Sequence, residues 1–188
     1  MGKGRLEAFS DGVIAIIITI MVLELRAPHG EELSALAPLW PTFLSYILSF
    51  VFIAIYWNNH HHLMHAVTQV NGAILWANIH LLFWLSLTPF ATAWMGDNHF
   101  APMPVAIYGG VQCMAGVAYF ILVRTLIAHH GPESEIAARV GSDFKGKISV
   151  VIYIAAIGLS FANQWIALAL IVAVALMWLV PDRRFEKT

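Results

Sequence analysis

The 188-residue sequence has few charged residues and a single cysteine. Only 11% of its residues are Asp, Glu, Lys or Arg, and the formal net charge is −1, so the global balance gives no sign of a nucleic-acid partner. Cys113 has no second cysteine to pair with, and its apolar neighbours indicate simple burial. The sequence also lacks an HExxH metal motif, a low-complexity tract and an internal repeat. These absences argue against a disulfide-bonded, nucleic-acid-binding or repeat protein.

Hydrophobic residues are abundant instead. They make up 60% of the chain, and the mean hydropathy of +0.75 is outside the range of ordinary soluble domains. A bilayer core about 30 Å thick needs about 20 apolar residues of helix. Six runs approach or exceed that length, at 6–25, 41–63, 74–95, 103–128, 146–162 and 164–181. We therefore expect an all-α membrane protein with a single domain of six transmembrane helices over residues 1–188, in which Pro89 kinks or ends the third helix.

The first run has one feature of a cleaved signal peptide, because Lys3 and Arg5 precede an apolar stretch. However, Asp11 interrupts that stretch, the run is long enough to span, and no small-x-small cleavage site follows. The pattern favours a retained helix.

The basic residues predict the orientation in the membrane, because cytoplasmic loops are enriched in Lys and Arg. With six spans, Arg26 falls on one side. All the others fall on the opposite side: Lys3, Arg5, Arg124, Arg139, Lys145, Lys147, Arg183, Arg184 and Lys187. This asymmetry predicts an even number of spans and cytoplasmic termini.

Asp11 is the first ionisable group inside a predicted span, close to the cytoplasmic face. Such a group needs a partner, a water path or an interfacial position. One interpretation is a plain interfacial acid, and another is a local ion pair with Arg5. A third is a hydrogen-bond network with Ser10 and with side chains of the second and third spans at the same depth, namely Trp57, His60, His61 and Asn78. An indole and a neutral imidazole can each donate one hydrogen bond to a carboxylate.

The nine histidines raise a different hypothesis. His61 and His65 are spaced i, i+4 on one helix face, which suits a metal, and His60 or His61 with His80 is the candidate set for haem. The alternatives are interfacial or network histidines and proton-sensing groups. A histidine-ligated haem or metal protein is thus a less favoured alternative function.

Three stretches carry a family resemblance. They are R-x-x-x-F-S-D (Arg5, Phe9, Ser10 and Asp11), "YWNNHHHL" at the end of the second run, and "WANIHLLFWLSLTPFATAWMG" across the third. Together they resemble the potassium channel family of the lysosomal transmembrane protein 175 and its shorter prokaryotic relatives. His80 departs from the pattern, because an apolar residue is more usual there.

The resemblance implies a homotetramer in which the first helix of each six-span subunit lines a central potassium-conducting pore. It implies no Gly-Tyr-Gly filter, and this sequence has none. It further implies the plasma membrane of a prokaryote, self-association and membrane lipid as the partners, and potassium as the permeant ion without a cofactor.

The resemblance also implies where the hydrophobic constriction lies. Counted from the R-x-x-x-F-S-D motif as in the family, its position in this sequence is Ile16. Thr19 lies one turn outward, Leu23 lies on the same face, and Ile20 borders it. An isoleucine ring offers an ion no ligands, so the ion must lose part of its hydration shell to pass. Potassium is more weakly hydrated than sodium and therefore passes more readily. The Thr19 hydroxyls replace part of the lost water.

Periodicity alone does not choose the pore-facing stripe. Gly12, Ile16, Thr19 and Leu23 share one helical face, whereas Val13, Ile17, Ile20 and Glu24 form an equally apolar one. A secondary or proton-coupled transporter is the alternative function class. Only Pro89 hints at the broken helix that such a carrier uses, and its paired repeats are not visible.

Overall fold

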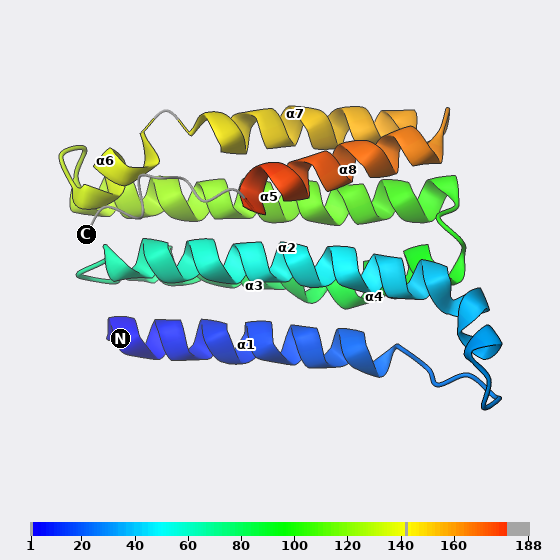
Figure 1. Ribbon diagram of the computed structural model, residues 1–188. Helices are drawn as coiled ribbons and strands as arrows, with labels where there is room; N and C mark the ends of the chain where they lie inside the picture. Colours follow the sequence, from blue (N-terminus) through cyan, green and yellow to red (C-terminus); the bar gives the residue numbers. More distant parts are fainter. Residues whose placement is uncertain (1, 142, 180–188) are drawn as a thin grey trace.

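The computed structural model of the chain describes residues 2–141 and 143–179. These residues form helices joined by loops, and the long helices run nearly parallel or antiparallel to one another (Figure 1). In chain order the elements are α1 (Lys3–Leu23), the 3-10 helix η1 (Leu33–Leu39), α2 (Trp40–His65), α3 (Gly72–Ser86), α4 (Thr88–Asp97), α5 (Pro102–His130), α6 (Glu135–Val140), α7 (Phe144–Leu159) and α8 (Gln164–Leu179). The predicted all-α class is confirmed.

The helices bury two hydrophobic cores. One joins α1, α2, α3, α5 and α6 through residues such as Ile14, Met64 and Leu122. The other joins α2, α4, α5, α7 and α8 through residues such as Phe52 and Ile171. Because α2 and α5 contribute to both cores, they connect α1 on one side of the bundle with α7 and α8 on the other (Figure 1).

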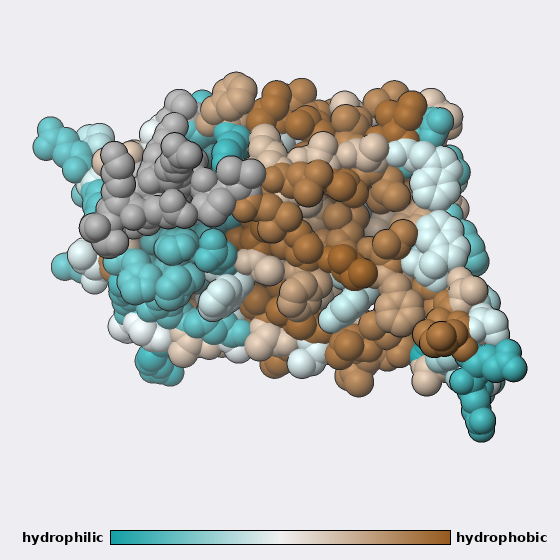
Figure 2. Space-filling model, in the orientation of Figure 1, coloured by the Kyte–Doolittle hydropathy of each residue, from teal (hydrophilic) through white to brown (hydrophobic). Residues whose placement is uncertain are grey.

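The outer surface suits a membrane. Figure 2 shows a hydrophobic band across the middle of the molecule with hydrophilic residues toward both ends. Within the described residues, four helical stretches are long and apolar enough to cross a bilayer: Lys3–Leu23, Leu33–His65, Gly72–Asp97 and Pro102–His130. The described lengths of α7 and α8 are 16 residues each, or about 24 Å at 1.5 Å per residue.

The third helical stretch is interrupted where the sequence predicted a break. α3 ends at Ser86, α4 begins at Thr88, and Pro89 occupies the first turn of α4, where its missing N–H is tolerated. α4 then packs tightly on α2, since a Cβ on Gly96 would lie 2.9 Å from the Thr42 Cα. Only glycine allows the two backbones to approach this closely.

The two ends of the bundle differ in charge. The start of α1, the α2–α3 connection, the end of α5 and α6 gather at one end (Figure 1). This end carries the basic residues Lys3, Arg5, Arg124, Lys145 and Lys147 and helix α6, which contains Arg139. Arg26 follows α1 at the other end, and Arg183, Arg184 and Lys187 lie outside the described residues.

Candidate functional site

Helix α1 has one face packed in the bundle and one face left open. The packed face consists of Leu6, Ser10, Ile14, Ile17 and Met21, all buried. The open face consists of Gly12, Ile16, Thr19 and Leu23, all exposed. Exposure reaches 58% at Ile16 and 77% at Leu23. A row of apolar side chains is thus available to another molecule or to lipid.

Burial distinguishes the two stripes between which periodicity alone could not choose. Ile17, in the middle of the alternative stripe, is only 2% exposed because it packs in the core of the subunit. Ile20 is 42% exposed and lies at the border between the two stripes. Only the stripe with Ile16 is open along its whole length.

The hydroxyl of Thr19 has a defined orientation. It donates a hydrogen bond to the Ile16 carbonyl oxygen at 2.8 Å. Since its only proton is engaged by its own helix, the oxygen keeps its lone pairs for an outside partner. A cation is such a partner.

A buried hydrogen-bond chain ties α1 to α3 and α2. Ser10 Oγ donates to the Leu6 carbonyl at 2.8 Å and accepts from Asn78 Nδ2 at 2.9 Å. Asn78 Oδ1 in turn lies 2.8 Å from His60 Nε2. Ser10, Asn78 and His60 are at most 1% exposed, so water does not compete for these bonds. We call these three residues the buried relay.

The buried relay fixes the histidine tautomer. With the Asn78 amide nitrogen donating to Ser10, its oxygen is the acceptor, and His60 Nε2 therefore carries the proton. His60 Nδ1 is buried and has no hydrogen-bond partner within the described residues, so a second proton on the ring would lack an acceptor. The relay therefore favours the neutral imidazole.

A second, more exposed contact holds α1 against α2. Trp57 Nε1 donates to Asp11 Oδ1 at 3.0 Å, and the indole stacks on His61 with ring centroids 5.7 Å apart. His61 Nε2 also lies 3.1 Å from His65 Nε2. The partner of Asp11 is thus a side chain 46 residues away in the sequence.

Two residues of the predicted motif take no part in these contacts. Arg5 is exposed, and the hydrogen bonds and ion pairs found in the described part of the chain do not join it to Asp11. Phe9 is 54% exposed on the surface of α1. The interpretation of Arg5 as the local counter-ion of Asp11 therefore finds no contact to support it.

The histidines are engaged in different contacts. His80 Nε2 accepts a hydrogen bond from Trp84 Nε1 at 2.9 Å, whereas His60 is bonded to Asn78. Within residues 2–141 and 143–179, no group of three His, Cys, Asp or Glu side chains is placed to hold a metal ion. The i, i+4 pair of His61 and His65 is brought together without a third such ligand.

Sequence reasoning missed a buried hydroxyl cluster that joins three helices. Ser49 Oγ lies 2.6 Å from Thr92 Oγ1 and 3.0 Å from the Tyr108 hydroxyl, linking α2, α4 and α5. The available signal was a hydroxyl residue in each of three apolar runs at similar depth, because such residues hydrogen-bond across helices in membranes.

The hydrophobic band and the long apolar helices define an α-helical protein of the membrane, with one apolar helix face interrupted by a hydroxyl. The family model described as "Endosomal/lysosomal potassium channel TMEM175" matches residues 5–89. Over 188 residues the chain is 54% identical to a potassium channel of Chryseobacterium sp. (strain P1-3), covering 100% of this chain and 98% of that protein.

Relatives at lower identity extend the match. The crystal structure of a lysosomal potassium-selective channel TMEM175 homolog from Chamaesiphon minutus superposes with a TM-score of 0.82 at 28% identity, covering 97% of each chain. The endosomal/lysosomal proton channel TMEM175 of Gallus gallus is 29% identical over 157 residues, which cover 75% of this chain and 31% of that protein. The chain belongs to the TMEM175 family of potassium channels.

Proposed function

We propose that this protein is a potassium-permeable channel in which helix α1 of several subunits surrounds the ion path. The observation that carries the proposal is the open stripe of Gly12, Ile16, Thr19 and Leu23, which the subunit leaves unpacked along the length of α1. The potassium channels of Chryseobacterium and Chamaesiphon to which the chain is similar support the choice of ion. The family is one of ion channels, so the chain is not an enzyme.

The assembly is a homotetramer with α1 next to the axis. In such an arrangement four copies of Ile16 form a ring, with Leu23 further along the same face and Ile20 at its edge. Support comes from the burial pattern, because the face with Ile14 and Ile17 is packed in the bundle while the opposite face is open. An apolar row with no partner inside its own subunit is well suited to a contact between copies.

Selectivity arises at the ring and its neighbouring hydroxyls. The isoleucines give a passing ion no ligands, so the ion sheds part of its hydration shell there, and this is harder for sodium than for potassium. The Thr19 oxygen, with its proton held by the Ile16 carbonyl, presents lone pairs that replace some of the lost water. Discrimination is modest because these groups form no rigid cage.

The buried relay and the Asp11–Trp57 hydrogen bond orient α1. Ser10 and Asp11 are adjacent, and their partners come from α3 and α2 respectively. Two contacts to two different helices resist both rotation and tilting of α1. A rotation of one residue step, about 100°, would turn Ile16 away from the axis.

Six spans and cytoplasmic termini complete the proposed topology, in the plasma membrane of a prokaryote and without a cofactor. The concentration of Lys and Arg at the end that includes the start of α1 supports this orientation. α7 and the described part of α8 are each shorter than a typical bilayer core, and local thinning of the bilayer accommodates short spans at modest cost.

Potassium flux into liposomes that contain the purified protein tests the proposal, with sodium and caesium as comparison ions. Ile16→Asn should raise the sodium-to-potassium permeability ratio several-fold, because an amide supplies ligands at the constriction. Ile154→Asn is a matched control, since Ile154 is 61% exposed but lies on α7. An unchanged ratio in Ile16→Asn, or an equal change in Ile154→Asn, would remove Ile16 from the constriction.

A further inference from the structure

Two histidines near the end of α2 bring their ring nitrogens together. His61 Nε2 lies 3.1 Å from His65 Nε2, and the two ring centroids are 4.5 Å apart. The residues are about one helical turn apart, so both side chains project from the same face of α2. His65 is exposed and His61 is half-buried, which leaves the pair accessible to small solutes at the basic end of the bundle. The pair is not part of the open stripe of α1.

The distance between the two nitrogens suits joint coordination of a metal ion. With metal–nitrogen bonds of about 2.0–2.1 Å, as for Zn²⁺, two nitrogens 3.1 Å apart subtend roughly 95–100° at the metal. This angle lies between those of octahedral and tetrahedral coordination. In the structure one neutral ring donates its Nε2 proton to the other. If that proton moves to Nδ1 of the same ring, a small rotation of both rings directs two lone pairs at one ion.

Two hydrogen bonds define how the start of α1 is aligned with the end of α2. Lys3 Nζ donates to the His65 carbonyl oxygen at 3.3 Å, and Asp11 Oδ1 accepts from Trp57 Nε1 at 3.0 Å. The helices are antiparallel, because the step from Lys3 to Asp11 along α1 corresponds to the step from His65 back to Trp57 along α2. The midpoint between the two contacts is about one helical turn from each of them on both helices.

That midpoint is occupied by Glu7 on α1 and by His61 on α2. Glu7 is half-buried, whereas Arg5 and Phe9 beside it are exposed, so Glu7 lies on the side of α1 that faces the bundle. Its carboxylate is also within electrostatic range of His60, the neighbour of His61. No set of three His, Cys, Asp or Glu ligands is already assembled in the described part of the chain, so the Glu7 side chain has to rotate toward the histidines.

We propose that His61, His65 and Glu7 bind one divalent transition-metal ion such as Zn²⁺, with water completing its coordination. Imidazole ligands favour Zn²⁺, Ni²⁺ or Cu²⁺ over Mg²⁺ or Ca²⁺. Because Glu7 belongs to α1 and the histidines belong to α2, the ion joins these two helices. His61 also stacks on Trp57, which donates to Asp11, so the ion acts beside the contact that orients α1. The site lies within one subunit and does not depend on the proposed assembly.

Calorimetric titration of Zn²⁺ into the purified full-length protein, with any affinity tag removed, tests the proposal. We expect saturable binding of one ion per subunit, and none of Mg²⁺ at the same concentrations. His61→Gln and His65→Gln should each weaken Zn²⁺ binding by more than about ten-fold, the smallest loss typical of removing even an outer-shell partner. His129→Gln is the matched control, because His129 is also exposed at this end of the bundle but lies on α5.

A further variant tests the link between the two helices. Zn²⁺ should raise the melting temperature of the unmodified protein, because an ion that binds only the folded state stabilises it. Glu7→Gln should weaken Zn²⁺ binding and reduce this rise, whereas Glu133→Gln, in the exposed connection after α5, should change neither. Full Zn²⁺ affinity in His65→Gln, an equal loss in His129→Gln, or unchanged affinity in Glu7→Gln would each overturn the proposal.

Discussion

Replacing Asn78 with leucine removes the central member of the buried relay while nearly preserving side-chain volume. Asn78 Nδ2 donates to Ser10 Oγ, and its Oδ1 accepts from His60 Nε2. The substitution therefore leaves one buried acceptor and one buried donor without partners. Neither group is exposed enough to find water, since Ser10 is 0% and His60 1% exposed.

The expected destabilisation follows from these two groups. A buried polar group that loses its partner costs about 1–3 kcal/mol, and hydrogen bonds between membrane helices average roughly 0.6 kcal/mol with a maximum near 1.7 kcal/mol. For two groups we expect a loss of about 2–4 kcal/mol in the free energy of unfolding. This corresponds to roughly a 30- to 900-fold change in the unfolding equilibrium constant.

Reversible unfolding in detergent micelles measures this loss, with Asn58→Leu as control because Asn58 is exposed on α2. The control should change stability by less than about 0.5 kcal/mol. The double variant with Ser10→Ala should be less destabilised than the sum of the single variants, because they share a bond. A loss below about 0.5 kcal/mol with additive single effects would show that the relay does not hold α1.

Three further variants test other parts of the account. Asp11→Ala removes the acceptor of the Trp57 indole and should shift the assembled protein toward single subunits in size-exclusion chromatography with light scattering; normal assembly and conductance would refute the bracing role. Thr19→Val keeps the side-chain shape but removes the oxygen, so it should lower the potassium-to-sodium permeability ratio while preserving flux; an unchanged ratio would exclude a ligand role. Gly96→Ala forces a Cβ to 2.9 Å from the backbone of α2 and should reduce stability by about 1–3 kcal/mol, whereas Gly110→Ala should not; equal melting temperatures would contradict the close packing.

The helices were predictable from the sequence because the bilayer imposes both length and composition. Each of the six apolar runs corresponds to a helical stretch, and Pro89 lies where the third stretch breaks. The described lengths of α7 and α8 were less predictable. The predicted fifth run extends to residue 162 through Phe161 and Ala162, whereas the structure ends α7 at Leu159 and has a turn before α8.

The orientation of α1 could not be obtained from its own sequence. The stripes that contain Ile16 and Ile17 are equally apolar, and only packing against the other helices of the bundle buries Ile17. The partner of Asp11 was ambiguous for the same reason. Arg5 is close in sequence, but Trp57 is brought within hydrogen-bond distance by the pairing of α1 with α2.

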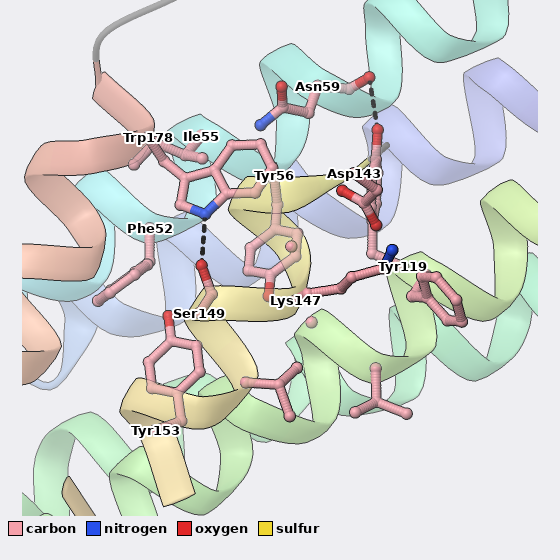
Figure 3. Close-up of a pocket in the computed structure, with 15 residues that line it drawn as sticks. Phe52, Ile55, Tyr56, Asn59, Tyr119, Asp143, Lys147, Ser149, Tyr153 and Trp178 are labelled. Carbon is pink, nitrogen blue, oxygen red and sulfur yellow. Dashed lines mark hydrogen bonds between the residues drawn. The ribbon is translucent and has the colours of Figure 1, made fainter. Parts of the chain in front are cut away.

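A pocket of about 350 Å³ in the part of the bundle away from α1 was beyond sequence reasoning altogether (Figure 3). Its wall combines residues from α2, α5, α7 and α8, each of which reads as ordinary apolar or aromatic helix surface. A void of this kind depends on how four helices fail to fill the space between them. Periodicity along one helix carries no information about that space.

Thiol modification at position 16 tests most directly whether α1 surrounds the ion path. The variant Ile16→Cys is made together with Cys113→Ala and reconstituted in liposomes, and a cationic methanethiosulfonate reagent is added while potassium flux is recorded. We predict that the reagent abolishes most of the flux in this variant and leaves the matched variant Ile154→Cys on α7 unaffected. Unchanged flux through Ile16→Cys after the reagent, or equal inhibition of Ile154→Cys, would contradict the account.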